Sequence, residues 1–298
     1  MTKTTPTILE THRVPELSEK QRLQDYAVGI FKRIISRKGT KKAIKAGRIF
    51  VNGIKGHTGD WIKGGEEICL YEAVVSKKPK LNIPLDVLFE DDYLAVVFKP
   101  AGVLVSGNKR FTLENALSFN LKKSSQLDAL QRPEPIHRLD YPTTGALLIG
   151  KTASIVIQLN ALFENRQIEK QYVAVTQGIM QKAGFIETEI DGKASKSEFQ
   201  KLDMVNSERF KALNLVLLQP HTGRRHQLRK HLSGMGNPIL GDSLYTEEAL
   251  LLKGKGLYLH AYSLSFQHPI TEKAIFCSAR LPKKYLKIFP EAHTLLGE

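Results

Sequence analysis

The sequence has little cysteine, no long apolar run and too few acidic residues to balance its basic ones. The only two cysteines among 298 residues, Cys69 and Cys277, lie in no CxxC pair or Cys/His cluster, so a disulfide framework and a zinc site both lack ligands. Apolar runs such as Leu94–Phe98 are far shorter than the ~20 residues of a membrane-spanning helix. The first twenty residues have no apolar core of a secretory signal. We therefore expect a cytoplasmic protein without a membrane segment or a bound metal.

Basic residues dominate the charge, with 44 Lys and Arg against 30 Asp and Glu and a formal net charge of +14. Residues 1–80 hold 17 basic and 8 acidic residues, so most of the excess lies in the N-terminal quarter. The segment Lys32–Arg48 contains eight basic residues and no acid. An isolated run of this kind is often only a solvated helix face, but with this net charge it also indicates a polyanionic partner.

The pattern around the basic run predicts a small module. Apolar residues at helical spacing predict a first helix, carried by Leu23, Ala27, Ile30, Phe31 and Ile34. We expect a second short helix from Thr40 that ends at Gly47, then a strand with an Asn52-Gly53 turn and another strand over Glu67–Tyr71. Residues 76–84 carry prolines and lysines without periodicity and read as a linker. The expected domains are residues 1–75 and 85–298.

The segment from Ile35-Ser36-Arg37 to Val51-Asn52-Gly53 resembles the S4 RNA-binding module, which presents basic helix residues to RNA phosphates. The resemblance implies that six side chains contact RNA: Arg37, Lys38, Lys41, Lys42, Lys45 and Arg48.

Strands dominate the pattern after the linker and do not alternate regularly with helices. We expect strands over 94–98, 146–149, 171–176 and 213–218, and helices over 112–121, 153–163 and 224–232. This order predicts an α+β domain with a mixed, largely antiparallel sheet. Gly145–Thr152 fits the phosphate-binding pattern GxxxxGK[ST], but the residues between its glycines are Ala-Leu-Leu-Ile, an apolar strand rather than a loop, so an NTPase is a distant alternative.

Three segments combine charged and small residues in ways that a core does not require. Asp140 precedes Pro142, which places it on a loop before a strand, although an Asp in such a turn is usually only a turn-former. If the chain is helical from Arg224, then Arg225 and Arg229 share one face and Thr222-Gly223 form an N-terminal turn that can hold an anion. Alternation in the strand around Tyr172 turns this ring away from its valine neighbours, where it is either a core residue or a platform for a base.

Taken together, these segments resemble the RluA-type family of RNA pseudouridine synthases over nearly all of residues 85–298. The matching motifs, in family order, are Phe98–Val103, His137–Asp140 with Thr143–Gly145, Lys170–Tyr172, Thr222–Arg229, Pro238–Asp242 and Leu259–Ala261. The resemblance implies that uridines in structured RNA, either rRNA or tRNA, are isomerised to pseudouridine. It assigns catalysis to Asp140, Arg229 and Tyr172, and substrate contacts to Arg138, His137, Thr144, Arg224, His226 and Gln227.

The implied reaction exchanges a C–N bond for a C–C bond without a change of oxidation state, so we expect no cofactor. Asp140 would act beside the sugar carbon C1′, either as nucleophile or as base, with Arg229 as the cation that pairs with it. We expect a monomer. The alternative from another class is a non-catalytic protein that only binds structured RNA.

Overall fold

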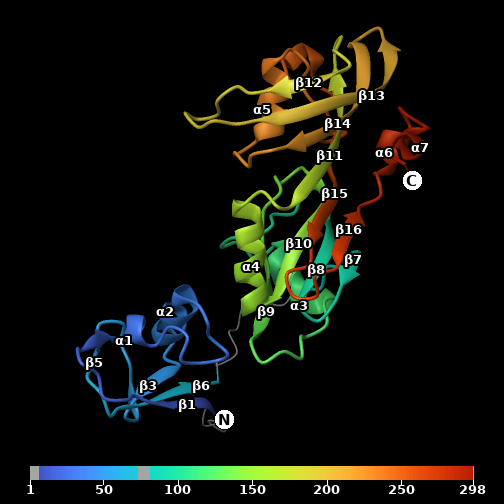
Figure 1. Ribbon diagram of the computed structural model, residues 1–298. Helices are drawn as coiled ribbons and strands as arrows, with labels where there is room; N and C mark the ends of the chain where they lie inside the picture. The colour runs from blue at the N-terminus through green and yellow to red at the C-terminus, as the bar shows by residue number, and fades with distance from the viewer. Residues whose placement is uncertain (1–6, 73–80, 298) are drawn as a thin grey trace. The chain divides into compact units, whose positions relative to one another are not determined.

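The computed structural model describes residues 7–72 and 81–297, in two compact units. Of the described residues, one unit comprises 7–72 with the segments 123–131 and 151–154, and the other comprises 81–122, 132–150 and 155–297. The predicted linker spans residues 76–84, and its residues 76–80 lie outside the described part of the chain. Figure 1 labels most of the helices and strands of each unit.

The N-terminal unit is a small sheet with two helices. Its four-stranded sheet has the order β1-β6-β3-β4, formed by β1 (Ile8–Arg13), β6 (Glu67–Tyr71), β3 (Ile49–Val51) and β4 (Ile54–Lys55). The other elements are a β2–β5 pair and two helices: β2 (Gln21–Arg22), β5 (Trp61–Ile62), α1 (Leu23–Tyr26) and α2 (Arg37–Lys45). The predicted turn joins β3 to β4, since Asn52 and Gly53 both have positive φ, at 50° and 76°.

The first predicted helix is wrong for most of its length, because α1 ends at Tyr26. Its apolar residues are buried nevertheless: Ala27, Phe31 and Ile34 belong to the core of the unit. Gly29, with a φ of 81°, turns the chain where a helix would have continued. The helical spacing of these apolar residues therefore indicated that they are buried, although most of the segment is not a helix. The second helix forms, and Ser36 caps it by accepting a 3.0 Å hydrogen bond from the Gly39 amide.

The C-terminal unit is built on one ten-stranded sheet, which confirms the predicted mixed, largely antiparallel α+β class. The main strand order is β12-β13-β14-β11-β15-β10-β8-β7, with β16 beside β15 and β9 beside β10. The strands are β7 (Val87–Glu90), β8 (Leu94–Lys99), β9 (Ala129–Pro135), β10 (Thr144–Thr152), β11 (Glu169–Gln177), β12 (Ala183–Ile186), β13 (Ser197–Ser207), β14 (Lys211–Pro220), β15 (Leu259–Gln267) and β16 (Ala274–Ser278). Strands β10 and β15 run parallel, whereas the pairs β8–β10, β11–β14, β11–β15, β12–β13, β13–β14, β15–β16 and β7–β8 run antiparallel.

Helices cover both faces of this sheet. The helices are α3 (Leu113–Asn120), α4 (Ala153–Glu164), α5 (Gln227–Gly234), a 3₁₀ turn (Glu248–Leu250), α6 (Lys283–Leu286) and α7 (Ala292–Leu295). Alternate residues of β8 face opposite ways: Leu94 and Val96 join the cluster that contains α4, and Ala95 and Val97 join the cluster that contains α3. Helices α4 and α3 therefore lie on opposite faces of the sheet at β8, near its β7 edge.

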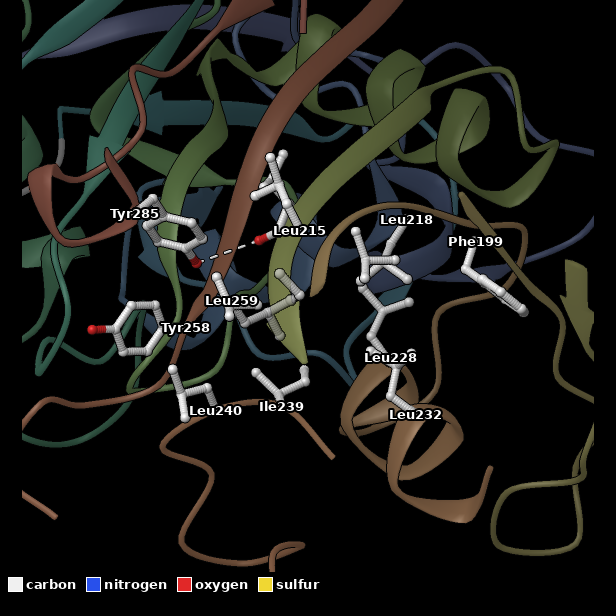
Figure 2. Close-up of a cluster of buried hydrophobic side chains, with 14 of the residues drawn as sticks. Phe199, Leu215, Leu218, Leu228, Leu232, Ile239, Leu240, Tyr258, Leu259 and Tyr285 are labelled. Atoms are coloured by element: carbon white, nitrogen blue, oxygen red, sulfur yellow. Dashed lines mark hydrogen bonds between the residues drawn. The ribbon is translucent and has the colours of Figure 1, made fainter. Parts of the chain in front are cut away.

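Helix α5 packs on the other end of the sheet. Leu228 and Leu232 project from α5 toward Leu218 and Phe199 of the strands, as Figure 2 shows. The helix begins three residues later than predicted, because His226 has a left-handed backbone with a φ of 55°. Arg225 is therefore outside the helix and exposed, while Arg229 is buried, so the two do not share a face as predicted.

Strand β10 contains the whole phosphate-loop-like segment, so no loop separates its two glycines. Gly145 lies within the strand, and its φ is 116°. A Cβ atom there would lie 2.1 Å from the carbonyl oxygen of Ala261 on β15. Glycine is required because the two parallel strands approach so closely at this residue.

Candidate active site

Asp140 lies on the predicted loop between β9 and β10. Its side chain is 20% exposed, so the carboxylate reaches solvent while most of its surface is enclosed. Backbone hydrogen bonds hold the loop, since the Thr143 amide donates to the Asp140 carbonyl over 3.1 Å and the Gly102 amide donates to the Tyr141 carbonyl over 2.9 Å. The motif that contains Gly102 is thus tied to the loop that carries Asp140.

Lys99, at the end of β8, is a buried cation beneath this loop. Its Nζ donates hydrogen bonds to the carbonyl oxygens of Pro100, Tyr141 and Thr143, over 2.9, 3.2 and 2.7 Å. Burial lowers the pKa of Lys99 to about 8, against the opposing effect of Asp140. The sequence motif contains Lys99, but sequence reasoning assigned this residue no role. The available signal was a lysine that ends an otherwise apolar strand.

Arg229 pairs with Asp140 and with a second carboxylate. Its Nη1 donates to Asp140 Oδ2 over 3.3 Å, while Nε and Nη2 each donate to Asp242 over 2.7 Å. The Arg229 side chain is 4% exposed, and Asp242 is completely buried. Burial opposes the charge of Arg229, but its hydrogen bonds and charge interactions with Asp242 and then Asp140 raise its pKa. The cation remains charged in a site that largely excludes water.

His226 faces the other oxygen of the carboxylate. Its Nε2 lies 3.7 Å from Asp140 Oδ1, and its Nδ1 lies 2.9 Å from the hydroxyl of Tyr245. Burial lowers the pKa of His226, although Asp140 acts in the opposite direction. Burial therefore favours the neutral imidazole, and Arg229 supplies a positive charge beside Asp140.

Tyr172 on β11 completes the neighbourhood of the carboxylate. Its ring packs against the cluster that contains Leu139, the residue before Asp140. Burial raises the pKa of Tyr172, and the negative charge of Asp140 raises it further. The phenol therefore stays protonated at physiological pH and cannot act as a general base. The structure thus brings together all three residues that the sequence assigned to catalysis.

His137 is turned away from this group. Its Nε2 accepts a 3.1 Å hydrogen bond from the Leu148 amide, and its ring lies 5.0 Å from that of Phe163. Burial, assisted by the charge of Lys170, lowers the pKa of His137 to about 3. The neighbouring Arg138 is exposed. The side chain of His137 therefore supports β10, and its predicted contact with substrate remains a prediction.

Three more predicted substrate contacts are engaged within the protein. The buried hydroxyl of Thr144 lies 2.7 Å from Nδ1 of His260. The buried Gln227 ties the start of α5 together, since its Oε1 accepts from the Thr222 hydroxyl and the Arg224 amide over 2.7 and 3.0 Å. The Nε of Arg224 donates to the Ala194 carbonyl over 3.1 Å. These bonds hold Thr144, Gln227 and Arg224 to other parts of the protein, and their contact with substrate is likewise still a prediction.

The basic side chains of α2 gather on one surface of the N-terminal unit. They line a shallow hollow of about 570 Å³: Arg37, Lys38, Lys41, Lys42 and Lys45. Arg37 also pairs with Asp25 of α1. Arg48 lies outside this set, because it is half-buried and its Nε donates to the Tyr71 carbonyl over 3.1 Å. We call the five residues of the hollow the α2 basic surface.

In the described parts of the chain, no three His, Cys, Asp or Glu residues are grouped so that they could hold a metal. Nor does any helix of residues 7–72 or 81–297 combine the length and apolar character needed to cross a membrane.

Known proteins similar to this chain share one activity. The family model described as RNA pseudouridylate synthase matches residues 93–234. A relative named ribosomal large subunit pseudouridine synthase D, from Xanthomonas campestris, is 30% identical over 91% of this chain and 88% of its own length. The tRNA pseudouridine synthase C of Pasteurella multocida is 33% identical over 68% of this chain and 94% of its own. The solved structure titled Human RNA Pseudouridylate Synthase Domain Containing 4 superimposes with a TM-score of 0.54 at 26% identity, covering 71% of this chain and 92% of that one.

Proposed function

The chain belongs to the RNA pseudouridine synthase family and isomerises uridine in RNA to pseudouridine, and we propose that Asp140 is the carboxylate that acts at C1′ of the target nucleotide. The observation that supports this assignment is that each oxygen of the Asp140 carboxylate faces a nitrogen of a neighbouring side chain. Oδ2 faces the guanidinium of Arg229 at 3.3 Å and Oδ1 faces the imidazole of His226 at 3.7 Å, at the partly exposed end of an otherwise buried group. Arg229 thereby places a positive charge beside the carboxylate that the chemistry needs.

The reaction needs no second substrate. The bond between N1 of uracil and C1′ breaks, a bond between C5 and C1′ forms, and the proton lost from C5 is balanced by a proton gained at N1. Atoms and electrons balance without an oxidant or a nucleoside triphosphate. A carboxylate beside C1′ can stabilise the positive charge that develops on the sugar as the first bond breaks, or form a covalent bond to it.

The target uridine must leave its stack to reach Asp140, at a cost of a few kcal/mol. In our proposal the ring of Tyr172 lies against the extruded base, and the exposed Arg138 occupies the space that the base leaves. A protonated phenol suits this role, because a neutral ring stacks on uracil without adding a charge beside Asp140. The walls around the nucleotide would be formed by Thr144, Arg224, His226 and Gln227, while His137, which bonds the Leu148 amide, would support β10.

The α2 basic surface would hold RNA phosphates, as in an S4-like module. Arg37 and Lys38 lie in the first turn of α2, where the helix dipole disfavours cations. Arg37 with Lys41, and Lys41 with Lys45, are like-charge pairs at i,i+4, which destabilise a helix. An arrangement that is unfavourable for the helix alone is explained by an anionic partner, which would neutralise these charges.

Within the class of structured RNA, we propose ribosomal RNA as the substrate rather than tRNA. Residues 81–298 make up less than three quarters of the chain, so the 91% match to the large-subunit enzyme must extend into the N-terminal unit. The match to the tRNA enzyme covers 68% of the chain, a share that residues 81–298 can account for without the N-terminal unit. We further propose a cytoplasmic monomer: Asp140, Arg229, His226 and Tyr172 all come from one chain, and Cys69 and Cys277 are free thiols, which suits a reducing compartment.

An Asp140→Asn variant tests the assigned carboxylate. We expect its turnover on rRNA from cells that lack the gene to fall below detection, a loss of more than roughly a thousandfold, while RNA affinity stays within severalfold. Pseudouridine would be read as carbodiimide-dependent stops of reverse transcription. Asp203→Asn, on β13, is the matched control and should retain full activity. Turnover by the Asp140 variant would remove Asp140 from the mechanism, and stops confined to tRNA would overturn the choice of substrate.

A further inference from the structure

Two side chains on the segment after α5 touch the partners of Asp140 and have no role in the proposed function. They are Asp242, which is buried with its side chain completely closed off, and Tyr245, three residues later. A buried carboxylate is costly unless it is paired. Asp242 is paired with Arg229, the same cation that faces Asp140, so the two carboxylates compete for one guanidinium.

Asp242 determines which way the guanidinium of Arg229 points. Its two oxygens accept from Nε and Nη2 of Arg229 in a bidentate pair, with both distances 2.7 Å. The Leu244 amide donates to Oδ1 of Asp242 over 3.0 Å, which fixes the carboxylate itself. A guanidinium held along this edge turns its Nη1 toward Asp140, and Nη1 is the nitrogen that bonds that carboxylate. The longer, single contact of 3.3 Å between Arg229 and Asp140 is the result.

The backbone under Asp242 is fixed by a tight turn. The Asp242 amide donates to the Ile239 carbonyl over 3.1 Å, and Gly241 between them has a φ of 78°. A Cβ atom at Gly241 would lie 2.1 Å from the carbonyl oxygen of Gly256, so only glycine fits this turn. Ile239 and Leu240 are anchored in the core cluster of Figure 2. The tight turn and the core contacts of Ile239 and Leu240 therefore hold the backbone of Asp242 in place.

Tyr245 determines the orientation of His226 in the same way. We assign the ring proton of His226 to Nε2, which faces a carboxylate that can only accept, so that Nδ1 is the acceptor. The hydroxyl of Tyr245, 2.9 Å away, then donates to Nδ1. The Tyr245 ring also lies under the guanidinium of Arg229, 5.1 Å from its centre, and its carbonyl accepts from the Ser233 hydroxyl over 2.7 Å.

The charges explain why a second carboxylate is needed. Without Asp242, the full guanidinium fork of Arg229 would be free to pair with both oxygens of Asp140. Such a pair would neutralise Asp140 and occupy the oxygens that must approach C1′. With Asp242 present, the cation is shared, and Asp140 keeps a negative charge and an unblocked edge.

We propose that Asp242 and Tyr245 are positioning residues for the isomerisation: Asp242 holds Arg229 to a single contact with Asp140, and Tyr245 holds the protonated nitrogen of His226 toward the same carboxylate. This inference rests on the proposed role of Asp140. It predicts that both residues affect the rate of the chemical step and not the binding of RNA.

The test is steady-state kinetics of Asp242→Asn, Tyr245→Phe and their combinations with partner variants, on the same rRNA substrate. Asp242→Asn should lower kcat by about tenfold or more, and Tyr245→Phe by several fold, with KM within twofold of wild type. Each effect on kcat should nearly vanish once the partner side chain is replaced. In an Arg229→Met background, Asp242→Asn should change the residual kcat by less than about twofold. In a His226→Gln background, Tyr245→Phe should do the same. A residue that only supports the fold would instead lower activity in proportion to the unfolded fraction and would do so in every background.

The outcomes separate the two proposals. If Asp140→Asn is inactive but Asp242→Asn and Tyr245→Phe retain full kcat, the positioning roles are wrong and the role of Asp140 stands. If Asp140→Asn is active, the proposed role of Asp140 fails, and the positioning roles that rest on it fail with it, whatever the other variants do. If Asp242→Asn does not fold, as thermal unfolding would reveal, Tyr245→Phe decides, because it removes one oxygen from a half-buried ring. A rise in KM at constant kcat, or effects that add fully to those of the partner variants, would also contradict the inference.

Discussion

At the scale of single residues, His137 differs from its neighbours in the same motif. Three positions from Asp140, it serves as a neutral acceptor for the Leu148 amide, and its pKa is lowered to about 3, chiefly by burial. An unfolded chain binds a proton at histidine below about pH 6.5. Between pH 6.5 and 3 the unfolded state therefore holds one more proton than the folded state, so the free energy of unfolding falls as the pH falls.

We expect this histidine to account for about 2 kcal/mol of the stability lost between pH 7.5 and pH 5.0. Urea unfolding at the two pH values would measure the loss for the wild type and for His137→Asn, whose side-chain oxygen can still accept from Leu148. Other titrating groups contribute equally to both proteins, so the difference between the two losses isolates His137. Equal losses would show that the imidazole is protonated in the folded protein.

At the scale of elements, α2 carries a conflict between stability and binding. Replacing Lys41 with glutamine removes two like-charge i,i+4 pairs, so the free energy of unfolding should rise by roughly 0.5 kcal/mol. The same change removes one phosphate partner, so RNA affinity should fall and the slope of log K against log salt should weaken by about 0.7 to 0.9. Denaturant unfolding and salt-dependent filter binding measure the two effects.

Lys63→Gln is the matched control for Lys41→Gln, because Lys63 is exposed in the same unit but does not line the α2 basic surface. It should leave both the affinity and the salt slope close to those of the wild type. A Lys41 variant that loses stability, or that binds RNA with an unchanged salt slope, would mean that α2 is an ordinary solvated helix.

Sequence patterns identified helices and strands well where the spacing of apolar residues and the residue types at the ends of the element indicated the same structure. β6 forms over Glu67–Tyr71 as predicted, and α3 begins after Thr112, whose hydroxyl accepts from the Asn115 amide. The prediction failed at Leu23–Ile34, where the chain buries its apolar residues at helical spacing through turns. It also placed the start of α5 too early, since nothing in the composition of Arg224–His226 signals a left-handed residue there.

The site could be predicted only in part, for a related reason. The resemblance named Asp140, Arg229 and Tyr172, which the fold brings together from a loop, α5 and β11. The sharing of Arg229 by two carboxylates depends on the turn at Gly241 and on which face of α5 carries Arg229. That face is set by the start of the helix at Gln227. The three hydrogen bonds that Lys99 donates to backbone carbonyls likewise depend on how β8 lies against the loop that carries Asp140. Such contacts arise between distant segments and leave no local signal.

At the scale of the whole molecule, the charge and the chemistry belong to different parts of the chain. Most of the excess positive charge lies in the first 80 residues, whereas Asp140, Arg229 and His226 lie after them. If the α2 basic surface binds phosphates and the C-terminal unit performs the reaction, then binding and turnover can be impaired separately. A protein with one combined site would lose both together.

A variant that replaces all five residues of the α2 basic surface with glutamine tests this division. Its KM for rRNA at physiological salt should rise by at least about tenfold, while kcat at saturating RNA stays within twofold of wild type. Between 50 and 200 mM salt, wild-type affinity should fall roughly a hundredfold more than that of the variant, because about five fewer counterions are displaced. Asp140→Asn should show the reverse pattern, with normal affinity and salt slope but no turnover. If the glutamine variant instead lost kcat at saturating RNA, α2 would have to act on the chemical step, and the two functions could not be assigned to separate parts of the chain.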